Sequence, residues 1–142
     1  MSGRADPDAT PGARSGARRA RERALGLLYE AESREIGVVD LLRRQDLPPP
    51  PPAAEMIEGV AAHGAAIDGL LEEVAVDWSV ARMAPVDRAI LRLAVYELAH
   101  RPQTPTAVVL NEAVELADLY STASSGRFVN GVLATIARRV RK

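Results

Sequence analysis

The sequence predicts an all-α protein, a compact bundle of about six to seven helices. Apolar residues recur at helical spacing through most of the chain, no segment alternates like a strand, and prolines or glycines separate the apolar segments. Only 4% of the residues are aromatic, so the core must be built from Leu, Val, Ile and Ala, and a composition rich in Ala and Leu favours helices. A chain of 142 residues is expected to form one domain with a substantial core.

The N-terminal third predicts a tail, two helices and a spacer. Residues 1–15 are rich in Gly, Ala, Pro, Asp, Ser and Arg, which predicts a disordered basic tail ahead of a folded domain, residues 16–142. The first helix is expected over about 15–35, with a serine at its start as a candidate N-cap, and a short helix over about 38–45. Five consecutive prolines, 48–52, predict an extended spacer because proline cannot continue a helix.

The remaining chain predicts four further helices. A long helix is expected over about 54–76, followed by helices over 85–100, 106–120 and 124–139, with prolines or polar residues between them. The 85–100 helix is apolar on most sides, which predicts a central buried position. Trp78, between the first two of these helices, is expected to anchor the core or a hinge.

The charges are segregated along the chain. A formal net charge of −1 argues by itself against a nucleic-acid-binding protein. However, arginines concentrate in residues 4–23 and 138–141, whereas residues 55–77 carry acidic groups and no Lys or Arg, which can give two surfaces of opposite sign. No apolar segment follows the N-terminus as in a secretory signal, and no apolar run is long enough to cross a bilayer, so a cytoplasmic protein is expected.

The sequence lacks the usual signatures of catalysis. Without Cys, the chain can have no disulfide, no thiol nucleophile and no cysteine-ligated zinc. His63 and His100 do not have the spacing of metal ligands, and neither a Gly-rich phosphate loop nor a nucleophile elbow is present. We therefore expect no enzyme activity, no metal and no cofactor.

A basic stripe begins the first helix. Arg14, Arg18, Arg21, Leu25 and Leu28 are separated by alternating steps of four and three residues, which places them on one face of a helix. We expect the apolar half to dock on the core and the arginines to project as a cationic arm. Arginine suits RNA because its planar fork binds phosphates and stacks on bases. Taken alone, the pattern leaves nucleic-acid binding and a solvated helix face equally open.

Four residues of the last third are expected to be structural. Asn111 and Asn130 lie within apolar helices, where a buried amide usually joins helices by hydrogen bonds. Gly131 is expected to permit close approach of two helices. Glu112 is expected to form an ion pair with an arginine of the 85–100 helix, in preference to acid–base chemistry.

Four segments together resemble a known family. The arginine-rich start leads into the Ala-Leu-Gly-Leu-Leu-Tyr segment 24–29, and the central segment 86–98 follows. Asn-Glu-Ala at 111–113 and Phe-Val-Asn-Gly-Val-Leu at 128–133 complete the pattern. In this order, over about residues 17–137, the chain resembles the NusB family of bacterial transcription antitermination factors.

The resemblance implies an all-helical protein that binds single-stranded boxA-like RNA of ribosomal RNA leaders together with the ribosomal protein NusE, and that acts on the RNA polymerase antitermination complex. With Arg14 of the basic stripe, the residues implied to face RNA are Arg18, Arg19, Arg21, Tyr29, Arg127 and Phe128. Asp87 and Ser124 would face the partner protein. Family members commonly carry acidic residues where this chain has Ala123 and Ser124, so the contacts of that turn are expected to differ.

Two other functions stay open at this stage. The RNA-binding domain of a ribosomal RNA cytosine methyltransferase shares the implied fold, although a catalytic domain would be expected after it, and the sequence ends at Lys142 without one. A non-catalytic helical protein–protein adaptor is the other, and it would give the arginines no role. The oligomeric state also stays open between a monomer and a homodimer.

Overall fold

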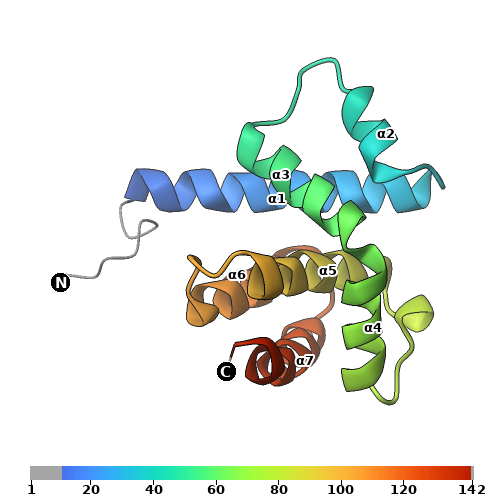
Figure 1. The fold of residues 1–142 in the computed structure, drawn as a ribbon, viewed down its shortest axis with the longest axis vertical. Coiled ribbons are helices and arrows are strands. Elements are labelled where there is room, and N and C mark those ends of the chain that lie inside the picture. Colours follow the sequence, from blue (N-terminus) through green and yellow to red (C-terminus); the bar gives the residue numbers. More distant parts are fainter. Residues whose placement is uncertain (1–10, 142) are drawn as a thin grey trace.

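The computed structural model describes the backbone of residues 11–141 and the side chains of residues 16–141, and in this part of the chain it contains helices and no strand (Figure 1). The elements are α1 (Pro11–Ser33), α2 (Val38–Arg43), α3 (Pro51–Ala62), α4 (Gly64–Val74), the one-turn 3₁₀ helix η2 (Val80–Arg82), α5 (Pro85–His100), α6 (Thr106–Tyr120) and α7 (Ser125–Val140). The predicted all-α bundle is confirmed.

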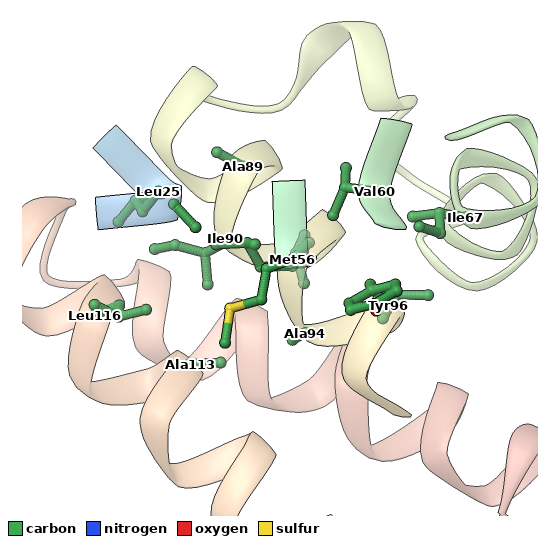
Figure 2. Packing of buried hydrophobic residues seen from close by; sticks show 14 of the residues in the cluster. Leu25, Met56, Val60, Ile67, Ala89, Ile90, Ala94, Tyr96, Ala113 and Leu116 are labelled. Atoms are coloured by element: carbon green, nitrogen blue, oxygen red, sulfur yellow. The ribbon is translucent and has the colours of Figure 1, made fainter. Parts of the chain in front are cut away.

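Helix α5 is the centre of the bundle, as its apolar sequence predicts. It packs against α1, α3, α4, α6 and α7, and it lies between α1 and α7 in Figure 1. Figure 2 shows Ile90 of α5 beside Met56 of α3, with Leu25 of α1 and Leu116 of α6 around them. Burying each such apolar side chain stabilises the fold by about 1.5–3 kcal/mol relative to leaving it exposed. Because α5 contacts five other helices, it contributes to most of the helix packing in the bundle.

The predicted long helix over 54–76 is wrong, because the structure divides this segment into two helices, α3 and α4, at His63. The backbone of His63 leaves the helical region (φ −109°, ψ 18°), and the following Gly64 begins α4 in a new direction. The turn lets Ile67 and Leu71 of α4 reach the core. The apolar periodicity continues through the break at His63, so it did not indicate that the chain changes direction there.

The predicted proline spacer and the predicted N-terminal tail both end earlier in the sequence than expected. Pro51 and Pro52 form the first turn of α3, where the missing N–H of proline removes no helical bond. Only residues 48–50 of the predicted spacer therefore remain in the connection between α2 and α3, which spans residues 44–50. Helix α1 begins at Pro11, not near Ser15. The rest of the predicted disordered tail, residues 1–10, lies outside the described residues.

Candidate nucleic-acid interface

Arg18 and Arg21, two arginines of the predicted stripe, face the bundle. Arg18 donates two hydrogen bonds to the carboxylate of Glu112 on α6, Nε to Oε1 at 3.1 Å and Nη2 to Oε2 at 2.8 Å, and these bonds raise the pKa of Arg18. Arg21 is buried and forms two 2.9 Å bonds to Glu97 of α5. The prediction that both arginines project as a cationic arm is therefore wrong, because α5 and α6 present carboxylates to the stripe and a buried guanidinium requires such partners.

The outer side of α1 carries different polar groups. Arg19 is exposed and has no ion pair among the described residues, and Arg23 is exposed with one hydrogen bond to Gln45, which follows α2. Tyr29, two turns along, is 45% exposed. The side chain of Arg14 lies outside the described part of the chain. The cationic surface of α1 is therefore adjacent to the stripe that the sequence singled out.

A hollow of about 430 Å³ opens between the segment before α5 and the turn between α6 and α7. Its lining residues are Trp78, Arg82, Met83, Ala84, Asp87, Thr122, Ser124, Ser125 and Phe128. We call this hollow the aromatic cleft. Trp78 is 51% exposed, so of the two positions predicted for it, core or hinge, the core position is wrong. Phe128 lines the cleft and also packs on the core.

The two walls of the cleft were not predicted together. One wall belongs to the segment 78–84, whose sequence contains the only Trp of the chain between polar neighbours, Asp77 and Ser79. A lone Trp in a polar segment, four residues before Arg82, was the sequence signal that could have indicated a binding site here. Trp78 lies near the turn 122–125 because of the way α5 orients both segments. A local sequence pattern cannot predict that orientation.

Asp87 does not have the position expected of a partner-binding residue. Its side chain is buried, and its carboxylate accepts hydrogen bonds from Ser121 Oγ at 2.6 Å and Ser125 Oγ at 3.0 Å. Direct contact with a partner protein is therefore the wrong interpretation of Asp87, because both carboxylate oxygens are bound within the chain. Ser124 is exposed at the cleft and forms no side-chain cap on α7, so its partner contact stays a prediction.

Arg88, the neighbour of Asp87, makes a second set of internal bonds. Its guanidinium donates to both carboxylate oxygens of Glu32 on α1, and its Nη1 donates to the carbonyl oxygens of Val80 at 2.7 Å and Met83 at 3.0 Å. The hydrogen bond from Arg88 holds the pKa of Glu32 below its usual value, and the same bond raises the pKa of Arg88. The first turn of α5 thus joins α1 to one wall of the cleft.

Three of the residues expected to be structural in α6 and α7 occupy other surroundings. Asn111 and Asn130 are exposed, so their interpretation as buried amides is wrong; each lies on the outer side of its helix. Gly131 is also exposed, and a Cβ there would meet nothing within 4 Å, so it permits no close helix approach. Glu112 forms an ion pair, but its partner is Arg18 of α1, so the predicted pairing with an arginine of the 85–100 helix is wrong.

The two histidines form a ring stack away from the cleft. The imidazoles of His63 and His100 lie 3.8 Å apart between centroids, with an angle of 17° between their planes. Burial and the neighbouring His63 lower the pKa of His100. Among the described residues, no group of three His, Cys, Asp or Glu side chains could hold a metal ion, and no helix there is long and apolar enough to cross a membrane.

Comparison with known proteins gives consistent results. A sequence profile of the NusB family matches residues 18–138. The chain is 51% identical over 122 residues to the transcription antitermination protein NusB of Acidothermus cellulolyticus, covering 83% of this chain and 84% of that protein. It is 50% identical over 125 residues to NusB of Saccharopolyspora erythraea, covering 84% of each.

Solved structures agree with the sequence comparison. The chain is similar to T. maritima NusB, with a TM-score of 0.81 and 32% identity over 89% of this chain and 93% of that one. It is also similar to a chain of a crystal structure of the antitermination factors NusB and NusE in complex with dsRNA, with a TM-score of 0.72 and 27% identity over 92% and 99% of the two chains.

Proposed function

The chain belongs to the NusB family, and on this premise we propose that it is an antitermination factor that binds single-stranded boxA-like RNA of ribosomal RNA leaders. We further propose that it does so together with the ribosomal protein NusE, as part of an RNA polymerase antitermination complex in the cytoplasm. Relatives that are 50–51% identical to this chain carry the antitermination name, which favours this function over that of a methyltransferase domain.

The observation that carries the proposal is the composition of the aromatic cleft. Trp78 and Phe128 contribute aromatic faces from two different elements, in a chain with very few aromatic residues. Unpaired bases bind proteins chiefly by stacking on such faces and by hydrogen bonds to their edges. Arg82 and Thr122 line the same hollow and supply a cation and a hydroxyl. This combination suits a single-stranded RNA segment with its bases unstacked.

The outer face of α1 supplies a second surface, suited to phosphates. Tyr120 at the end of α6 donates a 2.9 Å hydrogen bond to Glu22 of α1, and Ser121 follows with its bond to Asp87 at the cleft. These contacts connect the face that carries Arg19 and Arg23 to the cleft through the end of α6. We propose that the RNA backbone follows this path, because phosphate contacts position a strand while base contacts read it.

NusE is proposed as the protein partner because a similar structure is a complex of NusB, NusE and dsRNA. The acidic segment 55–77 contributes less to a free acidic surface than its sequence suggests. Asp68 pairs with Arg92, and Glu73 pairs with Arg139. We therefore propose the exposed turn at Ser124 as the partner-facing position in this chain, in place of Asp87.

Binding of a fluorescently labelled boxA-like oligonucleotide tests the proposal. We expect Trp78→Ala to weaken binding by about 1–3 kcal/mol, the usual contribution of one stacked base, and Trp78→Phe to retain most of the affinity. Leu47→Ala is the control, because Leu47 is 81% exposed and lies outside the cleft. Unchanged affinity of Trp78→Ala would remove the cleft from the RNA site.

Arginine variants of α7 give a second, matched test. Arg127 adjoins Phe128 at the start of α7, whereas Arg138 lies near the other end of the same helix; both are exposed. We expect Arg127→Ala to weaken RNA binding and Arg138→Ala to leave it unchanged. Equal effects of the two variants would mean that only the total charge matters.

A further inference from the structure

We propose that two adjacent residues of α5, Asp87 and Arg88, are positioning residues that hold the opposite walls of the aromatic cleft at the separation RNA requires. The proposal rests on the proposed function, since it concerns the same cleft. It assigns neither residue to RNA contact. Arg88 does not line the cleft at all, and the carboxylate of Asp87 is already bound to two hydroxyls.

Arg88 holds the wall that carries Trp78 and Arg82. Its Nη1 reaches two carbonyl oxygens of the segment, those of Val80 and Met83, which bracket η2. The remaining donors of the guanidinium bind Glu32 on α1. One planar side chain therefore joins three pieces of the chain, which a lysine with its single compact ammonium could not do at once.

Asp87 holds the opposite wall. Ser121 directly follows α6 and Ser125 begins α7, so the two hydroxyl bonds to Asp87 fix the turn between these helices from both sides. Ser125 Oγ also lies 2.9 Å from Thr122 Oγ1 within the turn. Ser124 in this turn and Phe128 in the first turn of α7 line the cleft, so these hydrogen bonds also fix their positions.

Both walls of the aromatic cleft are bound to two consecutive residues, Asp87 and Arg88. The first turn of α5 sets where Trp78 and Phe128 lie relative to each other before any ligand arrives. Such preorganisation increases affinity because fewer groups must be ordered on binding. Loosening either wall should weaken RNA binding even though every RNA-facing side chain is retained.

The test compares Arg88→Lys with Arg92→Lys, one turn further along α5. Arg92 also forms a two-bond ion pair, with Asp68, and its Nη1 lies 3.5 Å from Glu32, the carboxylate that Arg88 binds. Unlike Arg88, it binds no residue of the cleft wall. Trp78 is the only Trp, so acrylamide quenching of its fluorescence reports the wall directly, without RNA. Urea unfolding gives the stability of each variant, and labelled boxA-like RNA gives the affinity.

We expect Arg88→Lys to make Trp78 more accessible to acrylamide and to weaken RNA binding about tenfold, the effect of losing one or two charged hydrogen bonds. Arg92→Lys should change neither quantity. Asp87→Asn, which can still bond both hydroxyls, should keep more RNA affinity than Asp87→Ala at matched folded fraction.

The two proposals fail in distinguishable ways. If the unmodified protein binds no RNA, the proposed function is wrong. If it binds RNA, and Arg88→Lys matches Arg92→Lys in both Trp78 quenching and affinity, the positioning role is wrong. A change in Trp78 quenching with unchanged RNA affinity also contradicts it, because the wall would then move without consequence for binding.

Discussion

Arg21 of α1 and Glu97 of α5 face each other through two 2.9 Å hydrogen bonds inside the bundle, with side chains that are 6% and 5% exposed. The pair joins the N-terminal helix to the central helix where an apolar contact would otherwise be expected. Removing one partner of a buried pair leaves an uncompensated charge, which is far more costly than losing the attraction alone. The pair therefore fixes α1 in place.

Arg21→Ala is expected to lower the free energy of unfolding by about 3–5 kcal/mol. Arg19→Ala, two residues earlier on the exposed side, should stay within about 0.5 kcal/mol of the unmodified protein. Urea unfolding followed by circular dichroism measures both. Equal stabilities would show that Arg21 does not depend on Glu97 in solution.

Arg19→Ala combined with Arg23→Ala is expected to weaken RNA binding without unfolding the protein, because both side chains lie on the outer face of α1. For single-stranded RNA, each lost phosphate contact should reduce the slope of log affinity against log salt by about 0.7. Binding measured over a series of salt concentrations checks this. An unaltered slope would show that neither arginine contacts a phosphate.

The His63–His100 stack predicts a dependence of stability on pH. Burial and His63 lower the pKa of His100 in the folded state, so the unfolded chain binds its proton more readily. The stability from this group is fully present above its ordinary pKa of 6.5 and is lost as the pH falls through the lower folded value. We expect His100→Gln to reduce the fall in melting temperature between about pH 7.5 and 5.5. An identical fall in both proteins would contradict this expectation.

Two glycines should respond to alanine in opposite directions. A Cβ at Gly59 would overlap the ring of Tyr96, which is buried, so Gly59→Ala should cost about 1–3 kcal/mol by overpacking. A Cβ at Gly131 meets nothing, so Gly131→Ala should stabilise α7 by about 0.5–1 kcal/mol. Thermal unfolding separates the two outcomes. A stable Gly59→Ala variant would mean that Tyr96 can move aside.

Periodicity and breakers predict the later helices closely, because each is bounded by a local signal. Pro85 and Pro105 mark the starts of α5 and α6, and the observed bounds of both helices match the prediction. The break at His63 was missed because the apolar stripe continues on both sides of it. A local sequence pattern indicates which residues are buried. It does not indicate the direction that the next helix takes.

The candidate site was less predictable for the same physical reason. The stripe of Arg18 and Arg21 was correctly placed on one face, but whether that face meets solvent or carboxylates depends on α5 and α6. Asn130 was expected inside from its apolar neighbours, and it lies on the outer side of α7. Side-chain type indicates a possible chemistry, whereas the neighbours that use it are set by the tertiary fold.

The most direct test of the account is the fluorescence of Trp78 during titration with single-stranded boxA-like RNA, alone and with NusE. Because Trp78 is the only Trp and lines the aromatic cleft, a stacked base should quench its emission. We predict saturable quenching with the same Kd as that measured from a label on the RNA. RNA binding by the label with no change at Trp78 would contradict the central claim that the aromatic cleft is where this protein holds RNA.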